Sequence, residues 1–145
     1  MKTIMIATDG SEQAGEALDV AIELAKDAGA KLEVLSVRPQ RLAGRAGAGP
    51  AILEVEERDG AEHIAEAGVA TAAAAGVDAT AHVAHGDVVD CICTASGTLD
   101  ADLLVVGSRG HGSVTGALLG SVSHALIKRS QIPVTIVGHA LVHAS

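Results

Sequence analysis

The sequence predicts a single α/β domain over residues 1–145, built as an open, five-stranded parallel sheet with helices on both faces. Three observations support this fold class. The length suits one domain, short apolar runs at 103–106 and 134–137 are typical of buried parallel strands, and strand and helix patterns alternate along the chain. Because strand–helix–strand connections are right-handed, this alternation builds a parallel sheet, and the sequence shows neither an internal repeat nor a second domain.

The first strand is expected at residues 4–7, followed by a turn and a helix with Ser11 as its N-cap. Alanine and leucine then recur at helical spacing until Gly29, which suits a C-terminal cap. A second strand is expected at 32–37 and a long helix at 51–75. Between them, residues 39–50 lack any apolar period, so we expect a mobile loop there.

In the second half of the chain, we expect a strand at 78–84, a turn at 85–87 and a shorter helix at 88–96. The runs at 103–106 and 134–137 form the last two strands, with a helix at 121–129 between them. The last strand falls at an edge of the sheet, where its backbone groups need either protection or another chain.

Composition narrows the range of partners. Phe, Tyr and Trp are absent, so small aliphatic side chains have to fill the core through close approach of helices to the sheet. The net charge of −8 and the lack of stacking rings both argue against nucleic acid as a partner. The amino terminus reaches Asp9 too soon for a secretory apolar region, and no later stretch has membrane-spanning length, so we expect a cytoplasmic protein. We interpret Cys91 and Cys93 as packing residues.

A glycine-spaced segment follows the fourth strand and ends where a helix begins. Its pattern is G-x-x-G, nine residues, then G-S, with Gly107, Gly110, Gly120 and Ser121 at the fixed positions. Glycines let backbone N–H groups approach phosphate oxygens, and a helix N-terminus attracts anions. The common alternatives are missing, since there is no G-x-x-x-x-G-K-[ST] and no G-x-G-x-x-G after the first strand. The segment therefore predicts a nucleotide site of another kind.

The position of Asp9 points to the same edge of the sheet. Asp9, Val37 and Gly107 all lie at predicted carboxyl ends of strands, where open parallel sheets bind ligands. The alternative for Asp9 is that its carboxylate accepts N–H groups at the start of the first helix, and we favour ligand contact over that role.

Taken with its neighbours, this motif resembles the ATP-binding branch of the universal stress protein family over essentially the whole chain. The other matching segments are Ala7-Thr8-Asp9-Gly10-Ser11, Gly86, 102–107, 119–123 and 133–137. The resemblance implies a Rossmann-like sheet of the adenine nucleotide alpha hydrolase type. It also implies that ATP, with Mg²⁺ as a possible companion, is the ligand.

The resemblance assigns each site residue a place along the nucleotide. The adenosine end would be lined by Ala7, Thr8, Asp9 and Val37. Ribose and phosphates would be surrounded by Val106, Gly107, Arg109 and Gly110, and the phosphate tail by Gly120, Ser121, Val122 and Ser123. Family members often form homodimers through the last strand, so we expect a homodimer through Val134–Val137 and an unidentified protein partner.

The expected function is regulation of a stress response by nucleotide occupancy. Residues 107–121 offer no lysine and no evident base, so hydrolysis, if there is any, is expected to be slow, and no catalytic residue is assigned. Two alternatives stay open. One is a Mg²⁺-dependent ATPase or nucleotidyl-type enzyme assisted by Arg109 or His111, and the other is a dimeric interaction module without nucleotide.

Three further sets of residues each allow a functional and an ordinary interpretation. Arg41 and Arg45 could close over the phosphates as a lid, although solvated arginines are the more ordinary interpretation. His139 and His143 have metal-ligand spacing but no acidic or cysteine partner nearby, so no metal site is predicted. No G-x-S-x-G segment exists to support a nucleophilic triad.

Overall fold

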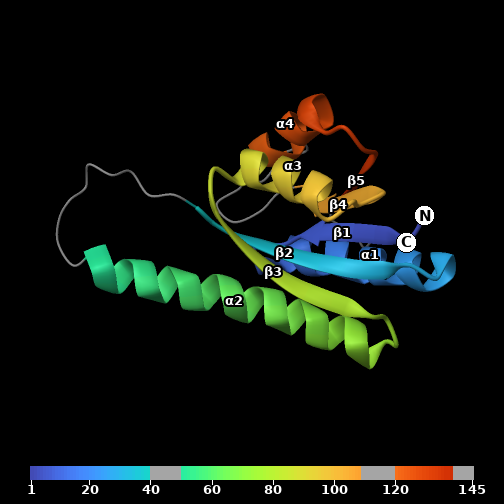
Figure 1. The fold of residues 1–145 in the computed structure, drawn as a ribbon, viewed down its shortest axis with the longest axis horizontal. Coiled ribbons are helices and arrows are strands. Elements are labelled where there is room, and N and C mark those ends of the chain that lie inside the picture. The colour runs from blue at the N-terminus through green and yellow to red at the C-terminus, as the bar shows by residue number, and fades with distance from the viewer. Residues whose placement is uncertain (40–49, 109–119, 139–145) are drawn as a thin grey trace, which may run out of the picture.

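Four helices cover the two faces of a five-stranded parallel sheet in the computed structural model, which describes residues 1–39, 50–108 and 120–138 (Figure 1). The strands are β1 (Thr3–Ala7), β2 (Lys31–Pro39), β3 (Ala79–Gly86), β4 (Leu103–Gly107) and β5 (Val134–Val137). The helices are α1 (Glu12–Ala28), α2 (Pro50–Ala74), α3 (Val88–Thr98) and α4 (Ser121–Arg129). The predicted fold class is confirmed.

The strand order is β3-β2-β1-β4-β5, so β1 lies at the centre and β3 and β5 form the two outer edges of the described sheet. Each neighbouring pair is parallel, for example Ile4 of β1 opposite Leu32 of β2 and opposite Leu103 of β4. In Figure 1, α1 and α2 lie below the sheet, and α3 and α4 lie above it.

Side chains alternate between the two faces of each strand, which produces two apolar layers. Ile4, Ile6 and Val34 pack with the buried alanines of α1 and α2, and Met5 and Leu104 pack with α3 and α4. Both layers are built without aromatic rings, so the elements come close together. At Gly68 of α2, an added Cβ would lie 2.9 Å from Val34 Cγ1, which no real Cβ tolerates without a shift.

Most predicted boundaries hold. Ser11 caps α1 through a bond from Ala14 N–H to its Oγ, and Gly29 ends the helix in the left-handed conformation with φ of 67°. The helix at 121–129 and the strand at 134–137 appear with the predicted bounds.

The predicted turn at 85–87 is wrong. His85 and Gly86 belong to β3, paired with Arg38 and Pro39 of β2, and Asp87 is the N-cap of α3. The reason is that β2 extends past residue 37, so its backbone continues to offer partners to β3. Of the predicted loop at 39–50, the first residue ends β2 and the last begins α2, and the rest lies outside the described residues.

Candidate functional site

The site predicted from the strand ends lies where the sheet reverses its winding direction. From β1 the chain proceeds outward to β2 and β3 on one side and later to β4 and β5 on the other. Ligands of open parallel sheets bind at such a reversal, outside the carboxyl ends of the strands. The pairing of β1 with β4 ends at Ile6 and Val105, so Ala7 and Val106 follow the last paired residues. We call the position between the carboxyl ends of these two strands the crevice.

The first rim of the crevice is the loop that leaves β1. Thr8 N–H donates to Leu35 C=O of β2 at 2.9 Å, which continues the sheet by one residue. Thr8 Oγ1 then accepts Gly10 N–H at 3.2 Å, and Asp9 Oδ1 accepts Ser11 N–H at 2.9 Å. The Asp9 carboxylate therefore stabilises this loop, which is close to the alternative given for it in the sequence analysis. Its contact with a ligand stays a prediction. The loop thus keeps its shape through its own side chains.

A residue of α2 closes over this rim. Gly10 has φ of +81°, a conformation that favours glycine, and a Cβ there would lie 3.0 Å from Ile64 Cδ1. Ile64 therefore lies close to the β1–α1 loop, a contact that its helical spacing alone does not predict. Val37 lies two residues beyond Leu35 on β2 and packs, half-buried, in the layer of α3 and α4.

The second rim joins the end of β4 to the start of α4. Ser108 N–H donates to Val137 C=O at 2.9 Å, and Gly120 N–H donates to Ser108 C=O at 2.7 Å. Ser123, which is 3% exposed, places its Oγ 2.8 Å from Gly107 C=O and 3.2 Å from Ser108 C=O. These contacts fix the N-terminus of α4 against the carboxyl end of β4. The Ser123 hydroxyl is thus used within the fold.

The N-terminus of α4 has no side-chain cap. Its N-cap is Gly120, which has no side chain to cap the helix, and no side-chain cap hydrogen bond is found there among the described residues. The first helical bond runs from His124 N–H to Gly120 C=O, so the N–H groups of Ser121, Val122 and Ser123 precede the helical ladder. With the positive end of the helix dipole, they form an arrangement suited to an anion.

A buried amide oxygen lies in the first turn of α1. Gln13 Oε1 has no hydrogen-bond partner among the described residues. Such an atom costs free energy unless a donor reaches it, so a ligand hydroxyl or amino group would stabilise it. Sequence reasoning missed Gln13, because a glutamine after an N-cap is ordinary.

The structure brings ten of the twelve predicted binding residues to the two rims and to the strand ends beside them. They are Ala7, Thr8, Asp9, Val37, Val106, Gly107, Gly120, Ser121, Val122 and Ser123. The other two, Arg109 and Gly110, lie outside the described residues. The same holds for the predicted lid residues Arg41 and Arg45, for His111, and for His139 and His143.

The described residues give little evidence for a reactive cysteine or for a metal site. Cys91 and Cys93 are free and half-buried. Burial raises the pKa of the Cys91 thiol, and the nearby carboxylates of Asp87 and Asp90 raise it further, which favours the unreactive thiol form. Among the described residues, no group of three or more His, Cys, Asp and Glu side chains is arranged to hold a metal ion.

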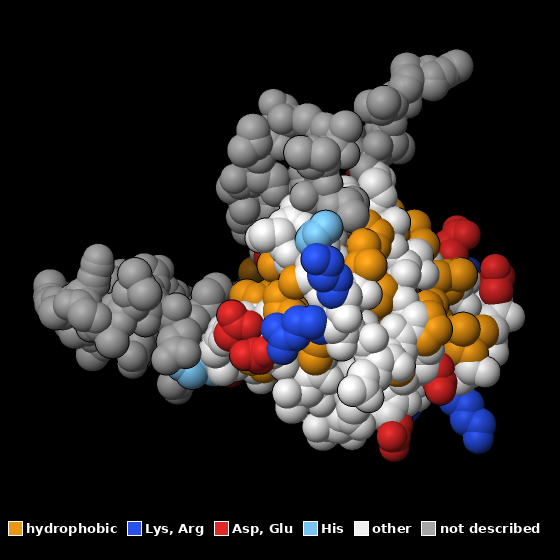
Figure 2. Space-filling view, turned by 90° about the horizontal axis from the view of Figure 1, so that it is seen from above, with side chains coloured by type: hydrophobic (Ala, Val, Ile, Leu, Met, Phe, Trp, Pro, Cys, Tyr) orange, Lys and Arg blue, Asp and Glu red, His pale blue; other side chains and the backbone are white. Residues whose placement is uncertain are grey.

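The outer surface over α3 and α4 carries side chains of mixed character. Figure 2 looks onto the layer of α3 and α4, where basic, acidic and hydrophobic side chains alternate in small groups and no broad basic patch forms among the described residues. One ion pair there joins Arg129 of α4 to Asp90 of α3 at 2.5 Å. None of the helices in the described ranges combines the length and apolar character needed to cross a membrane.

Comparisons with known proteins show the family and the fold of the chain. A family model described as the universal stress protein family matches residues 1–138. Universal stress protein YxiE of Bacillus subtilis is 31% identical over 144 residues, covering 92% of this chain and 97% of the relative.

Two solved structures are also similar. Hypothetical protein MJ0577 has a TM-score of 0.85 at 24% identity and 97% coverage of both chains, a likeness that shows the fold. A universal stress protein in complex with cAMP has a TM-score of 0.73 at 30% identity, covering 94% of this chain and 96% of that one.

Proposed function

Since the chain belongs to the universal stress protein family, we propose that it binds an adenine nucleotide, ATP above all, in the crevice between β1 and β4, and that nucleotide occupancy regulates its part in a stress response. The observation that carries this proposal is the uncapped N-terminus of α4, fixed beside the end of β4 by the bonds of Gly120 and Ser123. Support for the adenine base comes from the similar structure, at 30% identity, that holds cAMP.

The two rims suit the two ends of a nucleotide. On the β1 side, Thr8 and Asp9 offer polar groups and Val37 an apolar surface, which together suit adenosine. The buried oxygen of Gln13 adds an acceptor for a ribose hydroxyl or the adenine amino group. On the α4 side, the N–H groups of residues 121–123 suit phosphate oxygens. Arg109 and Gly110, and Mg²⁺, complete the proposed set.

Regulation fits this chemistry better than rapid turnover. Phosphoryl transfer needs a placed water or base and strong charge neutralisation. Within the described part of the site, the carboxylate of Asp9 is bonded to Ser11 N–H and the hydroxyl of Ser123 to two carbonyls. Bound phosphates would instead link α4 to the end of β4 and stabilise the folded chain by mass action.

The first experiment combines nucleotide analysis of the gently purified protein with calorimetric titration. The emptied protein is titrated with ATP, ADP, AMP and cAMP, each with and without Mg²⁺. Co-purified adenine nucleotide, or heats that fit a Kd in the micromolar range, which corresponds to about −8 kcal/mol, would support the proposal. If the purified protein contains no nucleotide and the titrations release no heat, the proposal of nucleotide binding fails, and the alternative of a dimeric interaction module replaces it.

We further propose that two copies associate through β5. This strand forms an outer edge of the described sheet, and Ser108 N–H donates to Val137 C=O, so the ladder alternation directs the backbone groups of Ile136 away from β4. Ile136→Pro removes one N–H from this outer edge and should shift the mass in solution from dimer to monomer. Ile136→Ala, which keeps the N–H, is the matched control in sedimentation analysis, and equal masses for both variants would contradict the proposal.

A further inference from the structure

The loop between β1 and α1 turns at Gly10, whose φ of +81° is a conformation that residues with a Cβ rarely adopt. Two hydrogen bonds set its local shape, from Gly10 N–H to Thr8 Oγ1 at 3.2 Å and from Ser11 N–H to Asp9 Oδ1 at 2.9 Å. Both bonds join residues of the loop to one another, and neither connects the turn to α2. Because glycine has the greatest backbone freedom, the place of this turn depends on what packs against it.

The side chain of Ile64 in α2 packs against the turn. A Cβ added to Gly10 would lie 3.0 Å from Cδ1, 3.1 Å from Cγ1 and 3.7 Å from Cγ2 of Ile64. All the atoms of this side chain beyond its Cβ therefore lie over the backbone of Gly10, in space that the absence of a Cβ leaves open. The contact restricts the one residue of the loop that has the most conformations to lose.

The position of Ile64 is set by the packing of its own helix below the sheet (Figure 1). One turn further along α2, Gly68 lies so close to β2 that an added Cβ would be 2.9 Å from Val34 Cγ1, and Val34 is fully buried. Ala61 and Ala65, on either side of Ile64 in the helix, are buried as well. This part of α2 is thus held closely against the sheet, and Ile64 is held against the loop with it.

Ile64 differs from Val69, which is also half-buried in α2. Val69 packs against the buried layer that α1 and α2 form with the sheet. Among the described residues, Ile64 is not one of the side chains that pack against either apolar layer. Its contact with the loop is therefore a feature that the described core does not require.

We propose that Ile64 is a positioning residue for adenosine. By packing on Gly10, it holds Thr8 and Asp9 in place before the nucleotide binds. This inference rests on the proposed function, in which the loop lines the adenosine end of the crevice. A loop that is ordered in advance loses less conformational entropy on binding, so the affinity for the ligand is higher. Ile64 acts through the loop and does not touch the nucleotide.

The test compares three variants of the full chain. Ile64→Ala removes every atom that lies over Gly10, and Ile64→Val removes Cδ1 alone. The matched control, Val69→Ala, shortens a half-buried side chain of the same helix that packs on the core. Calorimetric titration with ATP is carried out at a temperature where circular dichroism shows all the proteins folded. Hydrogen exchange of the Ser11 amide is measured by NMR in the nucleotide-free proteins.

We expect Ile64→Ala to bind ATP about three- to tenfold more weakly, as the loss of preorganisation in a short loop predicts. Ile64→Val should bind within about twofold of the natural chain, because most of the contact remains. Val69→Ala should be less stable but bind ATP as the natural chain does. The Ser11 amide should exchange faster in Ile64→Ala than in Val69→Ala. If Ile64→Ala does not fold, Ile64→Val decides through the exchange of the same amide, which should be faster than in the natural chain.

Four results would overturn the positioning role. If the natural chain binds ATP and Ile64→Ala binds it equally tightly, the role is wrong while the proposed function stands. The same follows if Val69→Ala weakens ATP as much as Ile64→Ala does. A weaker affinity with unchanged exchange of the Ser11 amide would instead indicate direct contact between Ile64 and the nucleotide. If the natural chain does not bind ATP, the proposed function fails and the role in positioning adenosine fails with it, whereas the exchange measurement still shows whether Ile64 orders the loop.

Discussion

The N-termini of α1 and α4 differ in whether a side chain of the N-cap accepts a hydrogen bond from the first turn. At α1, Ser11 Oγ accepts Ala14 N–H at 3.2 Å, after Thr8 and Asp9 have accepted N–H groups from the loop before it. At α4, the N-cap is Gly120, and within the described part of the chain no side chain caps the first turn. The N-cap of α3 resembles that of α1, because the Asp87 side chain accepts Asp90 N–H at 2.9 Å.

The difference shows where the chain leaves room for an external anion. Every helix begins with N–H groups that lack helical acceptors. Where a side chain supplies the acceptor, as at α1, added phosphate finds less to bind. The glycine at the N-cap of α4 has no side chain that could accept these groups beside the end of β4. On the proposed function, the α1 side therefore receives the uncharged adenosine and the α4 side the phosphates.

Replacing Gly120 with aspartate would break this contrast most strongly. Gly120 has φ of −69° and ψ of 165°, which any residue adopts, and aspartate is a preferred N-cap. Its carboxylate would occupy the N–H groups of α4 and repel phosphate. We expect ATP to bind about 10- to 100-fold more weakly, equivalent to about 1.4–2.8 kcal/mol, with stability unchanged or slightly raised. Calorimetric titration at constant ionic strength measures the affinity.

The matched control for that variant is Ser11→Asp. It places the same carboxylate at the N-cap of α1, where an acceptor is already present. ATP affinity should change by less than about threefold, because only one acceptor replaces another. If Ser11→Asp weakens ATP as much as Gly120→Asp does, the contrast between the two helices has no bearing on binding.

Ser123→Ala tests what holds α4 in place. The variant removes the hydroxyl that lies 2.8 Å from Gly107 C=O and 3.2 Å from Ser108 C=O, in a buried position. Loss of this donor should lower the free energy of unfolding by about 1–2 kcal/mol and weaken ATP severalfold. Urea unfolding is followed by circular dichroism, because the chain has no Trp or Tyr. Ser121→Ala, an exposed neighbour, should cost less than about 0.5 kcal/mol, and equal costs for the two variants would contradict this assignment.

The fold was predictable because its signals are local. Apolar runs marked β1, β4 and β5, and cap residues such as Ser11 and Gly29 marked the helix ends. The end of β3 was missed because His85 and Gly86 look like a turn when read alone. Their place in the sheet depends on β2 reaching Pro39, a pairing between distant segments that no local pattern contains.

The meeting of the candidate residues at one edge of the sheet was predictable, but their contacts were not. Glycine spacing and strand ends located the two rims, since parallel strands bring their carboxyl ends to one edge. The hydrogen bonds that shape those rims were not visible in the sequence. The role of Ser123 inside the fold and the approach of Ile64 to Gly10 depend on packing in three dimensions. Glu33 offered a signal that was overlooked, a carboxylate inside an apolar strand, and its partner His82 lies on the next strand.

Ser11→Ala should have a smaller effect than Ser123→Ala, and almost none on ATP. Loss of the bond from Ala14 N–H should lower the free energy of unfolding by about 1 kcal/mol, the usual cost of an N-cap. ATP affinity should stay within about twofold once the comparison is made at a temperature where both proteins are folded. A large loss of affinity would show that the N-terminus of α1 contributes to phosphate binding. The assignment of adenosine to the α1 side and phosphates to the α4 side would then be wrong.

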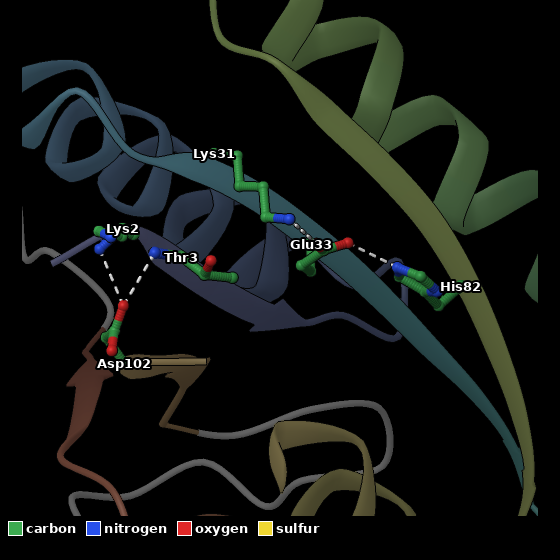
Figure 3. Close-up of polar contacts among 6 residues, drawn as sticks. All are labelled: Lys2, Thr3, Lys31, Glu33, His82 and Asp102. Atoms are coloured by element: carbon green, nitrogen blue, oxygen red, sulfur yellow. Dashed lines mark hydrogen bonds and ion pairs between the residues drawn. The ribbon is translucent and has the colours of Figure 1, made fainter. Parts of the chain in front are cut away.

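Asp102→Asn should have the smallest effect and extends the comparison to the amino ends of the strands. The Asp102 carboxylate accepts Lys2 N–H at 2.8 Å and Thr3 N–H at 3.0 Å, so it caps β1 as Ser11 caps α1 (Figure 3). Those backbone bonds, with smaller help from the charges of the amino terminus and Lys2, lower the pKa of Asp102. A carboxylate with a lowered folded pKa stabilises the protein above its unfolded pKa of about 3.9, and the stabilisation is lost as pH falls through the folded pKa.

The natural chain should therefore be slightly more stable than Asp102→Asn at neutral pH, and thermal unfolding should show the difference shrinking as the solution is acidified below about pH 4. A difference that grew on acidification would contradict the assigned bonds. ATP affinity at neutral pH should be equal for the two proteins, because the carboxylate lies at the end of the sheet opposite the crevice. If Gly120→Asp weakens ATP while Asp102→Asn leaves the affinity unchanged, phosphate recognition depends on the N-terminus of α4 and not on the net charge of the chain.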